Sequence, residues 1–160
     1  MNAEASHAED LRALYRELIL DHAKKPRNFR ALDKATNQAL GLNRMCGDRI
    51  RLHLELDGNR IMDASFEGTA CAITLASASL LTTLIVGRTV DEAIALGQAL
   101  HAHLSNNDMT IDGGSAAEEL GELRALAGVR EFPARVKCAT LPWETLRSAV
   151  RDDGGVATTE

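Results

Sequence analysis

The sequence predicts an α+β fold in which a small antiparallel sheet of about three strands packs against several helices. Residues 49–56 alternate strictly between polar and apolar side chains, which is the pattern of a strand with one buried face. The Asp-Gly-Asn sequence at 57–59 favours a hairpin turn, and residues 60–67 return as a second strand. Residues 72–86 carry no charge and are rich in Ala, Leu, Ile, Ser and Thr, which predicts a buried helix.

Further elements follow from helix start and stop signals. An S-x-x-E capping box opens a predicted helix over residues 6–25, and a T-x-x-E box opens another over residues 89–104. A last helix is expected over residues 140–150, with Pro142 in its first turn, where proline is tolerated. A third strand is expected within residues 38–45.

Length and composition indicate one domain and exclude several classes of protein. We expect residues 1–150 to form a single domain and residues 151–160 to be a flexible C-terminal tail. The formal net charge of -5 argues against nucleic acid as the main partner, since phosphate binding needs concentrated positive charge. No run of 18 apolar residues and no signal-peptide pattern occurs, so we expect a cytoplasmic protein with no membrane partner.

The chain has three cysteines, which is an odd number, and it has no export signal. A disulfide framework does not fit such a chain, so metal binding or thiol chemistry becomes a hypothesis, with small buried apolar cysteines as the alternative. Each cysteine lies at a junction between predicted elements. Cys46 precedes the first clear strand, Cys71 follows the second strand, and Cys138 precedes the last helix. Thiols at such junctions can converge at one end of a domain.

The sequence around the cysteines also favours thiolates. Cys71 and Cys138 both precede predicted helices, whose N-terminal ends stabilise negative charge. Three basic residues are close in sequence to the cysteines and would favour their ionisation: Arg49, Arg135 and Lys137.

A carboxylate is close in sequence to the first cysteine. Gly47 separates Cys46 from Asp48 and permits a tight backbone turn, so that both side chains can face one ion. Three thiolates and one carboxylate make a tetrahedral set suited to Zn²⁺, which accepts sulfur and oxygen ligands together. The spacing is not that of a zinc finger, so chemistry alone leaves zinc binding and unliganded cysteines as open alternatives.

Four segments in the same order resemble those of a known family. The chain resembles the SufU/IscU family of iron–sulfur cluster assembly proteins over roughly residues 14–150. The segments that carry this resemblance are LYRELILDH with KPRN (14–28), CGD (46–48), FEGTACAITLASAS (66–79) and GVREFPARVKCATLPW (128–143).

In two features the chain resembles the SufU branch of the family more than the IscU branch. Lys137 occupies the position before the third cysteine, where the IscU branch carries histidine, and residues 100–120 resemble an extra segment of SufU-type members. A lysine ammonium offers no lone pair to a metal. The resemblance therefore implies Asp48 as the fourth ligand beside Cys46, Cys71 and Cys138.

The resemblance implies a function in sulfur transfer. It implies a zinc-bound sulfur acceptor that takes persulfide sulfur from a pyridoxal-phosphate-dependent cysteine desulfurase of the SufS type, with a Suf assembly complex as a possible downstream partner. Cys46 is the expected nucleophile, because it is beside Gly47 at the end of a long loop, whereas Cys71 adjoins a buried helix. Two alternatives use the same residues: a scaffold that assembles a [2Fe–2S] cluster, and a structural zinc module.

Overall fold

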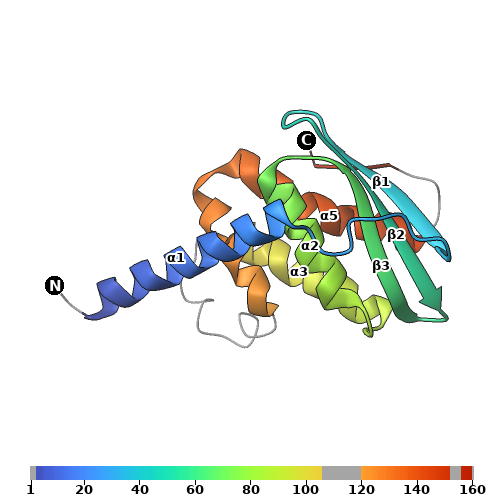
Figure 1. The fold of residues 1–160 in the computed structure, drawn as a ribbon, viewed down its shortest axis with the longest axis horizontal. Helices are drawn as coiled ribbons and strands as arrows, with labels where there is room; N and C mark the ends of the chain where they lie inside the picture. Colours follow the sequence, from blue (N-terminus) through green and yellow to red (C-terminus); the bar gives the residue numbers. More distant parts are fainter. Residues whose placement is uncertain (1–2, 106–119, 152–155, 160) are drawn as a thin grey trace.

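The computed structural model describes residues 3–105, 120–151 and 156–159, and within residues 3–11 it describes only the backbone. Helices and strands are arranged as the sequence predicted, an α+β fold with several helices on one small sheet (Figure 1). The expected segment 100–120 of the SufU type lies mostly outside the described residues. The elements, in chain order, are α1 (Ala3–Lys24), β1 (Asn37–Asn43), β2 (Asp48–Asp57), β3 (Arg60–Thr69), α2 (Ala72–Ile85), α3 (Val90–Ser105), the 3₁₀ helix η2 (Gly121–Glu131), α5 (Pro133–Arg151) and β4 (Val156–Thr158).

The sheet has the strand order β3-β2-β1-β4. The three predicted strands are confirmed and pair antiparallel, with Leu52 of β2 opposite Ala39 of β1 and Phe66 of β3. The fourth strand was not predicted: β4 pairs parallel with β1, where a flexible tail was expected. The three-residue length of β4 gives no sequence pattern long enough to predict a strand. The division of the chain at residue 150 stays a prediction.

One face of the sheet is covered by helices and the other is exposed in part. α5 contacts β1 and β2, and α2 contacts β3, so these two helices form the second layer (Figure 1). The alternation in β2 places Ile50, Leu52 and Leu54 in the core, while Arg49 and Arg51 are exposed on the other face. The period-2 pattern read from the sequence therefore fixes which side of β2 meets the helices.

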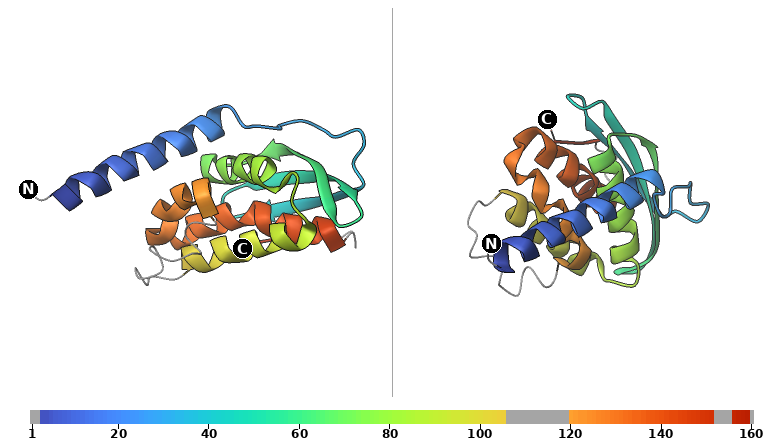
Figure 2. Two further views of the ribbon diagram at one scale, coloured as in Figure 1. Left: turned by 90° about the horizontal axis from the view of Figure 1, so that it is seen from below. Right: turned by 60° about the vertical axis from the view of Figure 1, so that its left-hand side comes forward.

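α1 packs on the helical layer through its C-terminal half and extends beyond it at its N-terminal end (Figure 2). Ile19 is buried against the core and Tyr15 and Leu18 pack partly against it. Leu14 is 62% exposed, so the apolar side chains of this helix are only partly buried. The side chains of the predicted S-x-x-E box lie outside the described residues, and α1 starts before them, at Ala3.

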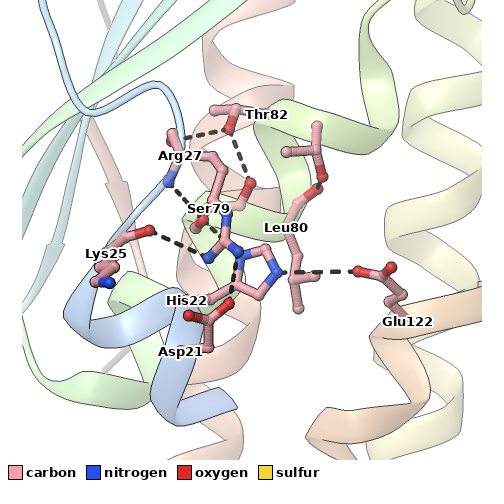
Figure 3. A network of polar contacts seen from close by, with 9 residues as sticks. Asp21, His22, Lys25, Arg27, Ser79, Leu80, Thr82 and Glu122 are labelled. Atoms are coloured by element: carbon pink, nitrogen blue, oxygen red, sulfur yellow. Dashed lines mark hydrogen bonds and ion pairs between the residues drawn. The ribbon is translucent and has the colours of Figure 1, made fainter. Parts of the chain in front are cut away.

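A polar network ties α1 to the middle of α2 (Figure 3). His22 is buried, and its Nδ1 lies 2.7 Å from the Ser79 hydroxyl, which also accepts the backbone N–H of Arg27 at 2.8 Å. Thr82 donates its hydroxyl to the Ser79 carbonyl at 2.8 Å. These contacts fix the end of α1 and the chain that follows it against α2.

The helices that follow α2 differ in how well the sequence predicted them. The capping box before α3 is confirmed, since the N–H of Glu92 donates to the Thr89 hydroxyl and the N–H of Thr89 donates to the Glu92 carboxylate, both at 3.2 Å. The start of the last helix was wrong, because α5 begins at Pro133 and contains Pro142 in its interior. None of the described helices is both long and apolar enough to cross a membrane.

Candidate metal centre

Cys46 lies in the short turn between β1 and β2, two residues before Asp48, the first residue of β2. Gly47 separates them with a φ of +72°, a left-handed backbone conformation that favours glycine. The Cys46 side chain is half-buried, whereas Asp48 is only 2% exposed. The turn thus presents a thiol near the surface and a carboxylate beneath it.

Cys71 lies next to the same carboxylate, at the N-cap of α2. Its backbone N–H donates to Asp48 Oδ1 at 2.8 Å, and its sulfur is 3.9 Å from Asp48 Oδ2. Gly68, just upstream, has a φ of +143°, and a side chain there would clash with the backbone of Arg49. Glycine at this position therefore lets β3 stay close to β2 just before the chain turns toward Cys71.

Cys138 reaches the site from α5 and is fully buried. Its sulfur lies 3.1 Å from the Cys46 sulfur and 3.6 Å from Nδ2 of the buried Asn43. One ligand atom each of Cys46, Asp48 and Cys138 lies within 4.8 Å of the other two. The Cys71 sulfur falls outside this group of mutually close atoms but borders it through Asp48. The turn, the start of α2 and α5 thus meet at one end of the sheet (Figure 1).

Electrostatics at the site disfavour an isolated Cys138 thiolate. Burial, followed by hydrogen bonds to Cys46 and Cys71, raises the pKa of Cys138, so this group stays a thiol at neutral pH when no positive charge is present. The prediction that a helix N-terminus stabilises the thiolate was wrong for Cys138. This residue lies in the second turn of α5, beyond the reach of that effect. For Cys71 the predicted position at a helix N-terminus was confirmed, since this residue is the N-cap of α2.

One of the three basic residues predicted near the cysteines lies beside them. Arg135 and Cys71 line the same cavity of about 530 Å³. The charge of Cys71, followed by a hydrogen bond with Cys138, raises the pKa of the Arg135 guanidinium. Arg49 and Lys137 line other cavities, which contain none of the cysteines.

The donor set fits a tetrahedral ion that accepts soft and hard ligands together. Two thiols and one carboxylate converge with a third thiol at their border, and ligand bonds of about 2.0–2.3 Å to Zn²⁺ require ligand atoms roughly 3.3–3.8 Å apart. The sulfur–sulfur distance of 3.1 Å and the Cys71–Asp48 distance of 3.9 Å are close to that range. Cys46, Asp48 and Cys138 already supply three close ligand atoms, and the Cys71 sulfur beside Asp48 is the fourth candidate.

Comparison with known proteins identifies the family. The model of the NifU-like N terminal domain matches residues 14–152. The chain belongs to this family. The match includes all four residues of the candidate metal centre.

Relatives of this NifU-like chain include sulfur-transfer and scaffold proteins. The chain is 41% identical over 149 residues to the zinc-dependent sulfurtransferase SufU of Bacillus subtilis, covering 91% of this chain and 96% of that protein. It is 37% identical over 142 residues to the iron-sulfur cluster assembly scaffold protein IscU of Streptococcus pyogenes, covering 88% and 85%. The resemblance to SufU/IscU proteins seen in the sequence is confirmed.

Solved structures agree with this fold. The crystal structure of FiSufU from Fervidobacterium islandicum AW-1 superimposes with a TM-score of 0.75 at 31% sequence identity and covers 84% of this chain and 94% of that one. The NifU-like fold thus extends over nearly all of the matched protein.

Two residues of this NifU-like site were not singled out from the sequence. Thr74 is fully buried, and its hydroxyl lies 2.6 Å from Asp48 Oδ2. Asn43, also fully buried, directs its amide N–H at the Cys138 sulfur, a contact that stabilises a thiolate. The spacing of Thr74, three residues after Cys71 and therefore on the same side of α2, was the available signal. Asn43 gave no comparable signal.

Proposed function

We propose that this protein is a zinc-bound sulfur acceptor that takes persulfide sulfur from a cysteine desulfurase for iron–sulfur cluster assembly. The observation that carries the proposal is the asymmetry of the site. Asp48 and Cys138 are buried, while Cys46 lies in a glycine-containing turn near the surface. Cys71 is half-buried as well, but it lies at the N-cap of α2 with its backbone N–H bonded to Asp48, so Cys46 is the ligand that can leave the ion and meet a partner. The name of the B. subtilis relative supports zinc as the ion.

The transfer step is a thiol–persulfide exchange. The Cys46 thiolate attacks the outer sulfur of the donor persulfide, the sulfur–sulfur bond of the donor breaks, and its cysteine leaves as a thiolate. One sulfur–sulfur bond forms and one breaks, so no external oxidant or reductant is needed. A bound zinc ion keeps cysteine ligands deprotonated at neutral pH. Asp48, Cys71 and Cys138 would hold the ion while Cys46 reacts.

The surface beside the site suits a donor protein with an acidic contact segment. The cavity next to Cys71 has an apolar floor that includes Ile19, and Arg12, Arg16 and Arg135 line it without any carboxylate among its described lining residues. Phe132 at this cavity is 58% exposed. An apolar floor with a positive rim favours a partner that carries apolar and acidic side chains.

The decisive experiment is sulfur transfer from a SufS-type desulfurase to zinc-loaded protein. Cys46→Ala is expected to abolish sulfur acceptance, measured as persulfide on the acceptor by mass spectrometry. Met45→Ala, a change at the exposed neighbouring residue, is the matched control and should transfer normally. Full sulfur acceptance by Cys46→Ala would contradict the proposal.

The alternative function is a scaffold that assembles a [2Fe–2S] cluster. The names of the IscU relatives favour it, since the same thiols can bind a cluster. Lys137 argues against it, because its ammonium offers no ligand atom and its side chain lines a different cavity from the cysteines. Anaerobic purification separates the two functions: stoichiometric zinc in a colourless protein supports the acceptor, whereas a coloured, transferable cluster supports the scaffold.

A structural zinc module is the third candidate, and a desulfurase assay distinguishes it. A purely structural ion predicts no stimulation of cysteine desulfuration by the added protein. The sulfur acceptor predicts turnover that rises with its concentration. We propose the cytoplasm as its location and a Suf assembly complex as the recipient of the sulfur.

A further inference from the structure

We propose that Thr74 is a positioning residue that fixes Asp48 and α5 relative to Cys71, so that three of the four proposed ligands form one rigid unit. This inference rests on the proposed metal site and concerns the holding of the ion rather than the attack by Cys46. It assigns a role to a buried hydroxyl that neither binds the ion nor contacts the donor.

The Thr74 side chain contacts three of the four ligand residues. Its hydroxyl lies 2.6 Å from Asp48 Oδ2, 3.2 Å from the Cys138 carbonyl oxygen and 3.4 Å from the Cys71 sulfur. The residue is fully buried, so water does not compete for these contacts. The other oxygen of Asp48 accepts the backbone N–H of Cys71. Both oxygens of this carboxylate are therefore held from α2.

The contact with Cys138 depends on a proline in α5. Pro142 has no N–H and lies four residues after Cys138, so the Cys138 carbonyl lacks its helical hydrogen-bond partner. A buried carbonyl without a partner destabilises the fold. The Thr74 hydroxyl occupies that position, and the interior proline thereby opens a place on α5 for a side chain of α2.

One hydroxyl proton serves both acceptors, and the shorter contact indicates the preferred one. At 2.6 Å, Asp48 receives the stronger, charge-assisted bond, while the Cys138 carbonyl is the second acceptor. The carboxylate oxygen is thereby oriented before the ion binds. Hydrogen bonds to metal ligands typically change metal affinity by about 10–100-fold when removed.

The experiment compares zinc affinity among variants by competition with a chromogenic chelator, with no desulfurase present. Thr74→Val keeps the shape of the side chain and removes the hydroxyl, and it is expected to weaken zinc binding by about 10–100-fold. Thr74→Ser restores the hydroxyl and should bind within about threefold of the wild type. Should Thr74→Val not fold, Thr74→Ala is measured in its place and judged by the same outcomes.

Ser77 provides a matched control on the same helix. Its buried hydroxyl donates to the Ala139 carbonyl of α5 at 2.6 Å but contacts no proposed ligand. Ser77→Ala should lower the melting temperature of the zinc-free protein about as much as Thr74→Val while leaving zinc affinity unchanged. Equal zinc affinity of Thr74→Val and the wild type, or equal losses in Thr74→Val and Ser77→Ala, would overturn the role of Thr74. Failure of the wild type itself to bind zinc would instead overturn the proposed function.

Discussion

Two polar clusters pack against α2 and differ in whether their polar groups already satisfy one another. The site cluster (Cys46, Asp48, Cys71, Thr74, Cys138) is at the start of the helix, and the His22 cluster (His22, Arg27, Ser79, Thr82) is at its middle (Figure 3). Within the His22 cluster, the imidazole, the hydroxyls and backbone groups bond to one another, and the charged side chain of Arg27 pairs with Asp21 at its edge. The site cluster gathers three thiols around a carboxylate, which an ion would neutralise. Burial of polar groups thus serves helix packing in one place and forms the proposed ligand site in the other.

The largest expected difference between the clusters is their response to zinc. At a free zinc concentration about 1,000 times the dissociation constant, binding stabilises the fold by about 4 kcal/mol, which raises the melting temperature by roughly 10 °C. Calorimetry with and without a chelator measures this shift. Cys138→Ala should lose most of it, and His22→Ala should retain it in full. An equal shift in both variants would contradict the comparison.

The His22 cluster should contribute to stability independently of the ion. His22→Ala removes one of the two partners of the Ser79 hydroxyl and leaves a cavity between α1 and α2, so we expect a loss of about 2–3 kcal/mol in the free energy of unfolding. Urea unfolding of zinc-free protein measures the loss. The zinc affinity of this variant should stay within about threefold of the wild type. A tenfold change would show that the two clusters are energetically coupled and would contradict their independence.

A smaller effect is expected from pH. Burial, followed by the charge of Arg27, lowers the pKa of His22 in the folded protein, against opposing effects of Glu122 and Asp21. The unfolded chain therefore takes up this proton first as the pH falls below about 6.5. The contribution of His22 is complete above that pH and is lost below it, at no more than about 1.4 kcal/mol per pH unit. Urea unfolding of the wild type and His22→Gln at pH 7.5 and 5.5 should show a stability difference that shrinks at the lower pH.

The smallest expected effect concerns the cavity beside Cys71, which borders the site cluster and not the His22 cluster. Arg16→Glu at the cavity beside Cys71 should raise the KM for the zinc-loaded acceptor in the desulfurase assay by about threefold, with kcat unchanged, because rim charges act mainly on encounter. Arg51→Glu, an equal charge change on the exposed face of β2, serves as the control. Equal KM values for the two variants would argue against docking at this cavity.

Most of the fold could be predicted because its signals are local. The alternation in β2, the capping box at Thr89 and the uncharged run of α2 each act within a few residues, so sequence patterns predicted them. The last helix was less well predicted because Pro142 was interpreted as a first-turn residue. The contact between Thr74 and the Cys138 carbonyl offsets the missing hydrogen bond, and that contact joins residues 64 positions apart.

The residues of the candidate site were likewise predicted only in part. The four proposed ligands were chosen by residue type and by their positions at junctions, and the structure brings Cys46, Asp48 and Cys138 together with Cys71 beside them. Their role in holding an ion stays a prediction. Thr74 and Asn43 were missed, because a buried threonine or asparagine has the same local pattern whether it serves packing or a ligand.

The sequence by itself determined the secondary structure around the core, the family and the chemical types of the site residues, because periodicity, capping and side-chain chemistry are local properties. Only the tertiary structure decided which thiol is buried, which is near the surface, and which hydroxyl holds the carboxylate. Those properties depend on the packing of α5 and α2 against the start of β2. Such contacts between distant segments determine both the burial that raises the pKa of Cys138 and the exposure of Cys46.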